Sequence, residues 1–130
     1  MSELVVSGTL TLDTTERAGA MHVEVPGGSA LYGAAAGSLL LPTRILGTVG
    51  DDFPFGRLSA LWQRGVDHSA IEVLRGPTFR WHARYEADGE QRTTLVRDRG
   101  VAEGRVPPVP PGDDAHYALM LGSTEPRVQV

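Results

Sequence analysis

Acidic side chains that follow apolar stretches are the first candidates for binding chemistry in this sequence. Asp13 ends an alternating stretch, Thr9-Leu10-Thr11-Leu12-Asp13, which comes after a short apolar run. Ligands of open α/β sheets bind in the crevice beyond the carboxyl ends of the strands. A carboxylate in that crevice can accept hydrogen bonds from two hydroxyl groups, as sugar recognition requires. Asp13 is therefore a candidate sugar-binding residue, and a solvated turn aspartate is the alternative.

A second acidic pair, Asp51 and Asp52, follows another apolar run and precedes a predicted helix. The two carboxylates could contact a ligand or a metal-bound water. Because a helix N-terminus favours negative charge nearby, the pattern favours the simpler interpretation of both residues as loop carboxylates.

A glycine-rich turn, Gly27-Gly28-Ser29-Ala30, precedes the first predicted helix. Backbone N–H groups at the start of a helix can hold an anion. The turn lacks the spacing of a dinucleotide-binding fingerprint, and close packing of the glycine backbone against a neighbouring segment is the favoured interpretation.

Several chemistries are excluded because the 130-residue chain lacks the residues that they need. It contains no cysteine, no lysine and no asparagine, so a thiol nucleophile, a disulfide, a Schiff-base lysine and a Walker-type phosphate lysine are all ruled out. The patterns identify no catalytic residue. A net charge of −4 gives no support to a nucleic-acid partner. We also expect no metal site, because no ligand spacing is shared by the four histidines His22, His68, His82 and His116.

Hydrophobic patterning and turn residues predict the elements that must position these candidates. Ser29 is the expected N-cap of the first helix, Pro42 its stop, and Gly65 the residue just after the second helix. The predicted helices cover residues 30–41 and 56–64. The predicted strands cover residues 4–8, 14–26, 44–50, 71–74 and 117–122, together with a hairpin over 78–96 that turns at Asp88-Gly89.

The hairpin has the clearest strand pattern in the chain. Phe79, Trp81 and Tyr85 alternate onto one face, and charged residues such as Arg80 and Arg84 occupy the other. Such an aromatic face could be a binding platform, but it is more often the packed face of a hairpin or a dimer contact.

The order of strands and helices predicts an α/β fold, a doubly wound parallel sheet that carries a β excursion. A parallel sheet needs helices on both faces, and two helices are too few, so we expect residues 1–130 to be an incomplete domain. A proline-rich stretch at about 105–114 is expected to be an extended connector. No signal peptide and no apolar run of membrane-spanning length is present, which predicts a cytoplasmic protein without a membrane partner.

Together these features resemble the N-terminal part of a ribokinase-like (PfkB-type) carbohydrate kinase. Within that family the chain is most similar to members with a GGSA-x-Y motif followed by VGDDFP. The resemblance extends over essentially the whole chain, and its landmarks occur in this order: Val5-Val6-Ser7-Gly8 with Asp13, Gly27-Gly28-Ser29-Ala30, Gly47-Thr48-Val49-Gly50-Asp51-Asp52, Gly56, Gly65-Val66-Asp67 and Pro77-Thr78.

The resemblance implies a Rossmann-like domain with a small β lid over the substrate, formed by residues of about 14–26 and 78–96. It implies ATP-dependent phosphorylation of a hydroxymethyl group on a sugar or nucleoside, and a possible homodimer through the lid. By the same resemblance Asp13 would hold substrate hydroxyls, Gly27 and Gly28 would pack against the sugar, and Tyr32 would replace the usual substrate-contacting asparagine.

Two signatures of the family are missing from the chain. The DTxGAGD-type segment, which supplies the anion-hole glycines and the aspartate base, is absent, as is the NxxE motif tied to metal and phosphate. ATP and Mg²⁺ belong to the full-length family, and we expect their site to lie outside this chain. The chain alone is accordingly expected to be an inactive substrate-binding and lid half of a kinase. A non-catalytic module that dimerises or binds sugar is the alternative, and an unrelated α/β protein is a third.

Overall fold

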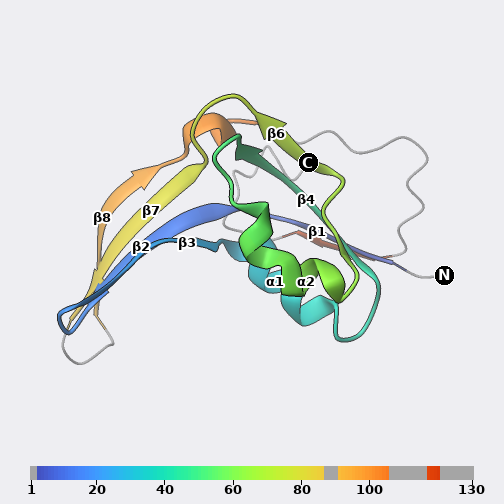
Figure 1. The fold of residues 1–130 in the computed structure, drawn as a ribbon, viewed down its shortest axis with the longest axis horizontal. Helices are drawn as coiled ribbons and strands as arrows, with labels where there is room; N and C mark the ends of the chain where they lie inside the picture. The colour runs from blue at the N-terminus through green and yellow to red at the C-terminus, as the bar shows by residue number, and fades with distance from the viewer. Residues whose placement is uncertain (1–2, 87–90, 106–116, 121–130) are drawn as a thin grey trace.

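The computed structural model describes residues 3–86, 91–105 and 117–120, in which the strands form two sheets (Figure 1). The first sheet is parallel, with the order β5-β4-β1-β9 and with β6 paired to the end of β4. Its strands are β1 (Leu4–Ser7), β4 (Thr43–Gly50), β5 (Val66–Asp67), β6 (Ile71–Leu74) and β9 (Tyr117–Met120). The second sheet has the order β3-β2-β7-β8 and is called the lid sheet below. Its strands are β2 (Thr11–Arg17), β3 (Ala20–Gly27), β7 (Phe79–Tyr85) and β8 (Arg92–Asp98).

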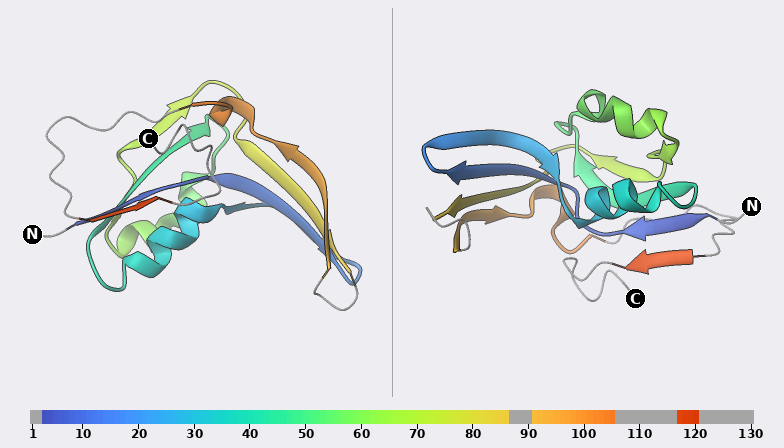
Figure 2. Two further views of the ribbon diagram at one scale, coloured as in Figure 1. Left: turned by 180° about the vertical axis from the view of Figure 1, so that it is seen from behind. Right: turned by 90° about the horizontal axis from the view of Figure 1, so that it is seen from below.

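The parallel sheet is built around β1 and β4, whose apolar residues are largely buried, as is typical of parallel strands. Val6 of β1 lies beside Ile45 of β4, and both side chains are fully buried. Two α-helices, α1 (Ser29–Gly37) and α2 (Ser59–Gln63), lie on the same side of this sheet (Figure 2). The predicted α/β class, with a parallel layer and a separate β sheet, is confirmed. Short 3-10 helices, η1 (Phe55–Leu58) and η2 (Gly100–Ala102), complete the described elements.

Helix α1 differs from its prediction at both ends. It ends at Gly37 instead of continuing to Leu41, and Leu39 and Leu40 are 75% and 85% exposed in the turn that follows. A Cβ atom at position 37 would collide with the side chain of Leu4, so the glycine lets the end of the helix pass close over β1. Ser29 is not the N-cap, because Gly28 occupies that position without a side-chain cap.

The lid sheet consists of two hairpins joined by the parallel pairing of β2 with β7. The single strand predicted over 14–26 is wrong, because the chain reverses there at Ala18 and Gly19. Both residues have positive φ angles, 47° and 81°, as a tight hairpin turn requires. The 78–96 hairpin is confirmed as β7 and β8, whereas its predicted turn and most of the proline-rich stretch lie outside the described residues.

The two sheets are joined at the carboxyl end of β4 by the buried side chain of Thr78. Its hydroxyl accepts a hydrogen bond from the Gly50 N–H (2.9 Å) and donates one to Asp52 Oδ1 (2.6 Å). The Thr78 N–H donates to the same carboxylate oxygen (2.9 Å), and Arg80 pairs with the other oxygen (2.8 Å). Gly50 is required here, because a Cβ atom would collide with the carbonyl oxygen of Gly76. Asp52 is a loop carboxylate, as interpreted from the sequence, but its partners are Thr78 and the lid-sheet residue Arg80.

The hydrogen bonds of Thr78 predict that its hydroxyl stabilises the fold. Thr78→Val keeps the shape of the side chain but leaves the Gly50 N–H without its buried acceptor, so we expect a loss of about 2 kcal/mol in the free energy of unfolding. Thr78→Ser keeps the hydroxyl and is the matched control, with a clearly smaller loss. Urea denaturation measures both, and a Thr78→Val protein as stable as the wild type would contradict the role assigned to this junction.

Candidate functional site

A pocket of about 530 Å³ lies between the lid sheet and the start of α1. Its volume is in the usual range for a small-molecule site. Side chains from β2, β7, β8 and α1 surround it, so segments far apart in the sequence meet there. Figure 1 labels these four elements. The lining residues are Thr9, Thr11, Asp13, Gly28, Ser29, Tyr32, Phe79, Trp81, Arg92, Thr94 and Arg97.

Asp13 supplies the carboxylate of this pocket. The sequence indicated a position beyond the end of the first strand, but Asp13 lies within β2. It is paired in register with Trp81 of β7. Its Oδ1 accepts a hydrogen bond from the Thr11 hydroxyl (2.6 Å). Burial raises the pKa of the Asp13 carboxyl above its ordinary value of 3.8, and the hydrogen bond from Thr11 offsets part of that rise. Asp13 is half-buried and has no cationic partner among the described residues, which suits it to accept hydrogen bonds from ligand hydroxyls.

The glycine pair before α1 is fixed by close packing. A Cβ atom at Gly27 would collide with the Asp13 carboxylate, and one at Gly28, whose φ is 100°, would collide with the Thr9 carbonyl oxygen. Gly28 lines the pocket, whereas Gly27 lies against Asp13 and is not among the lining residues. Gly27 therefore leaves room for the carboxylate, and Gly28 brings the start of α1 close to the loop at Thr9.

The N–H groups at the start of α1 are already used within the protein. The Ala30 N–H donates to the Thr9 carbonyl (3.0 Å), and the Ser29 N–H donates to the Thr9 hydroxyl (3.2 Å). The Thr9 N–H in turn donates to Ser29 Oγ (3.1 Å). The close-packing interpretation of the glycine-rich turn is therefore supported, and these two N–H groups do not fit a phosphate cradle.

Three aromatic side chains line the pocket together with Asp13. Tyr32 lies in the first turns of α1 and is 66% exposed, while Phe79 and Trp81 come from β7. The aromatic face of the hairpin thus lines a pocket at this end, which is the platform alternative that the sequence left open. Aromatic faces of this kind can stack on the apolar face of a sugar ring or on a nucleobase.

Three lining residues from β8 were not identified from the sequence: Arg92, Thr94 and Arg97. The guanidinium of Arg92 lies 5.0 Å from the centre of the Trp81 ring. Period-2 alternation places Arg92 and Thr94 on one face of β8 but would place Arg97 on the other, and the register shift between the His82 and Ala83 pairs brings Arg97 to the same face. The pairing of Trp81 with Arg97, which the sequence pattern does not contain, shows that this face lines the pocket.

The other polar candidates lie elsewhere. Asp51 accepts a hydrogen bond from the Gly76 N–H (3.4 Å) and does not line the pocket. His68 packs on Trp62 at 4.4 Å between ring centres, and His82 lies 2.9 Å from Glu16 Oε1. Across the residues that the structure describes, which exclude His116, no group of three or more histidine or acidic side chains is placed to hold a metal ion.

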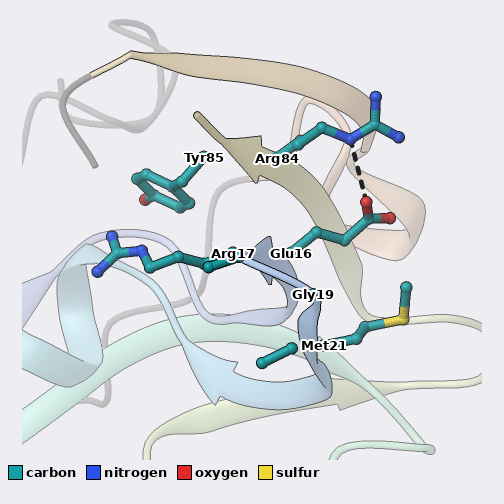
Figure 3. Close-up of a pocket in the computed structure, with 8 residues that line it drawn as sticks. Glu16, Arg17, Gly19, Met21, Arg84 and Tyr85 are labelled. Atoms are coloured by element: carbon teal, nitrogen blue, oxygen red, sulfur yellow. Dashed lines mark hydrogen bonds and ion pairs between the residues drawn. The ribbon is translucent and has the colours of Figure 1, made fainter. Parts of the chain in front are cut away.

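A second, smaller pocket of about 240 Å³ lies at the tip of the lid sheet (Figure 3). There the Arg84 Nε–H donates a hydrogen bond to Glu16 Oε2 (3.1 Å), and the Arg17 guanidinium lies over the Tyr85 ring. Hydrogen bonds from Arg84 and His82 lower the pKa of Glu16. The charged side chains of this pocket are therefore paired with neighbouring side chains, and these pairs connect β2 to β7.

Comparison with solved structures defines the class of fold as the N-terminal portion of the ribokinase fold. A ribokinase from Cryptococcus neoformans var. grubii serotype A, in complex with ADP, matches with a TM-score of 0.71 and 21% identity over 94% of this chain and 41% of its own. A nucleoside kinase from Methanocaldococcus jannaschii, described as an archaeal member of the ribokinase family, matches with a TM-score of 0.73 and 18% identity over 99% of this chain and 47% of its own.

Two further matches are to ligand-bound proteins. A nucleoside kinase from Burkholderia thailandensis in complex with inosine has a TM-score of 0.58 and 18% identity, over 75% of this chain and 36% of its own. A putative ribokinase II from E. coli in complex with ATP and Mg²⁺ has a TM-score of 0.62 and 20% identity, over 80% and 36%. This chain thus spans less than half the length of these kinases.

No family model and no curated protein sequence matches the chain. The described helices include none that is long and apolar enough to cross a lipid bilayer.

The opposite pKa shifts of Asp13 and Asp52 predict opposite effects of two matched substitutions. Because the pKa of Asp13 is raised in the folded state, ionisation of this carboxyl lowers the free energy of unfolding, and the loss grows as the pH rises above 3.8. Burial acts to raise the pKa of Asp52, but the bonds from Thr78 and Arg80 bring it below 3.8 overall, so Asp52 stabilises the fold above that pH and the contribution is lost on acidification.

At pH 7 we therefore expect Asp13→Asn to stabilise the chain and Asp52→Asn to destabilise it, and both differences should shrink toward pH 3.5. Denaturation of the three proteins at both pH values measures this. A destabilising Asp13→Asn at pH 7 would mean that Asp13 is a structural residue.

Proposed function

We propose that this chain is the acceptor-binding and lid part of an ATP-dependent kinase that phosphorylates a hydroxymethyl group of a sugar or nucleoside. The observation that carries this proposal is the pocket between the lid sheet and α1, which is lined by the Asp13 carboxylate and by the aromatic side chains of Tyr32, Phe79 and Trp81. The likeness of the fold to ribokinases and nucleoside kinases supports it.

Asp13 is the proposed acceptor-binding residue. Its Oδ2 has no hydrogen-bond partner among the described residues and can accept hydrogen bonds from adjacent ligand hydroxyls, which favour the ionised form. Tyr32 and Trp81 would contact the apolar face of the ring or base. Gly27 leaves room for the Asp13 carboxylate, and Gly28 lets the start of α1 lie close to Thr9. The proposed role of both glycines is therefore to shape the site.

The lid sheet would exclude water from the acceptor, which limits wasteful hydrolysis of the phosphoryl donor. ATP would provide the phosphoryl group and Mg²⁺ would neutralise its charge during transfer. The residues at the start of α1 do not fit a phosphate site, because Ser29 and Ala30 donate to Thr9. We therefore place nucleotide binding outside the described residues and expect the chain by itself to bind an acceptor without phosphorylating it.

The proposal is tested by binding to the purified 130-residue chain. Trp81 lines the pocket, whereas Trp62 is partly buried against the core and its Nε1–H donates to the Phe55 carbonyl (2.8 Å). The two indole N–H signals of a ¹⁵N-labelled sample therefore report the site and an internal reference. We expect sugars or nucleosides to shift the Trp81 signal alone, and Asp13→Asn to weaken binding at least tenfold, since a hydrogen bond to a charged group contributes about 1.5 kcal/mol or more.

Asp51→Asn, the same chemical change outside the pocket, is the control and should bind like the wild type. Addition of ATP and Mg²⁺ should yield no phosphorylated sugar. Equal weakening by both substitutions, or no movement of the Trp81 signal with any sugar or nucleoside, would contradict the proposal.

A dimer through the lid is the second proposal, and it also suits a non-catalytic module. β3 is an edge strand of the lid sheet, and its apolar side chains Met21, Val23 and Val25 are 55%, 59% and 39% exposed. Exposed apolar edge strands pair readily with another chain. The proposed partner is a second copy of the same lid.

Light scattering after size exclusion tests the dimer. We expect the wild type to be dimeric at micromolar concentration and Val23→Glu to be monomeric, because a charge on the shared edge is poorly tolerated. Val73→Glu places the same charge on β6, where Val73 is 51% exposed, and should leave the dimer intact. A monomeric wild type would remove this proposal.

A further inference from the structure

No carboxylate pairs with Arg92 or Arg97, two arginines of the candidate pocket, within the residues that the structure describes. Salt bridges to glutamate or aspartate occupy Arg44, Arg80, Arg84 and Arg105. Arg92 instead lies over the Trp81 ring, and both arginines line the pocket. Their charges are therefore available to a ligand.

The strand pairing places Arg97 in one row with the candidate acceptor-binding residue. Asp13 is paired with Trp81 across β2 and β7, and Trp81 is paired with Arg97 across β7 and β8. Neighbours across a sheet point their side chains to the same face. Adjacent strands are about 4.8 Å apart, so the backbones of Asp13 and Arg97 are roughly 10 Å apart on one face, with an aromatic ring between them. One small molecule can reach both ends of this row.

The charges of the pocket favour an anionic ligand. Two guanidinium groups face one carboxylate, although the whole chain carries a net charge of −4. Guanidinium groups bind phosphate and carboxylate oxygens through paired hydrogen bonds. Stacking on Trp81 holds Arg92 in place, which lowers the entropic cost of using it.

We propose that the acceptor is an anionic sugar, in which a phosphate or carboxylate group binds to Arg92 and Arg97 while hydroxyl groups bind to Asp13. The proposal rests on the acceptor-binding function proposed above and narrows its substrate class. Neutral sugars and neutral nucleosides are the competing ligands.

The test compares neutral and anionic forms of the same sugars with the full 130-residue chain. Ribose, fructose and glucose are each titrated beside a phosphate ester and a sugar acid that keep a free hydroxymethyl group, and adenosine and inorganic phosphate are titrated alone. The Trp81 indole signal is the readout, and Trp62 is the internal reference. The phosphate and acid arms distinguish the two sources of negative charge.

We expect at least one anionic sugar to bind tenfold or more tightly than its neutral form and than inorganic phosphate. Arg97→Gln and Arg92→Gln should each weaken that binding about tenfold. Arg75→Gln removes the same charge from an exposed position outside the pocket and should have no effect.

Three results would overturn the inference. Neutral sugars or adenosine that bind as tightly as the anionic forms, with no effect of Arg97→Gln, would overturn it and leave the acceptor-binding function standing. Inorganic phosphate that binds as tightly as any sugar phosphate would show that the sugar contributes nothing. No response of Trp81 to any compound would overturn both proposals.

Discussion

The buried hydroxyl of Thr78 is the contact on which the arrangement of the two sheets depends. It lies where the parallel sheet ends and the lid sheet begins, between the backbone of Gly50 and the carboxylate of Asp52. Arg80 extends the same contact to the edge of the lid through Glu24 (2.7 Å). Because the first residues of β7 are held in this way, Trp81 is placed opposite Asp13, and the pocket follows from that placement.

A second set of contacts fixes the other wall of the pocket. The loop at Thr9 connects β1 to the lid sheet, and its hydrogen bonds to Ser29 and Ala30 hold the start of α1 against it. The candidate site thus lies between two sets of hydrogen bonds, those of Thr78 that join the two sheets and those of Thr9 that hold the start of α1. Asp13 remains half-buried there, with a raised pKa and no cationic partner in the part of the chain that the structure describes, and such a stability cost is typical of a functional carboxylate.

The sequence allowed the fold class and part of the site to be predicted because those features depend on local patterns. Apolar runs identified β1, β4 and β6, and alternation identified β7 with its aromatic face. The contributions of Asp52 and Arg97 could not be predicted, since they depend on contacts with residues 26 positions away and on strand pairing. The early end of α1 likewise depends on the packing of Gly37 against Leu4, a tertiary contact that helix propensities cannot predict.

The central claim is that the Asp13 carboxylate binds the hydroxyl groups of a ligand. The most direct measurement is the pKa of Asp13, followed through its ¹³C carboxyl signal in the NMR spectrum with and without saturating sugar. We expect a pKa above 3.8 in the free protein that falls when the ligand binds, because hydroxyl donors favour the ionised form. A pKa that is unchanged by a ligand bound in the pocket would contradict it.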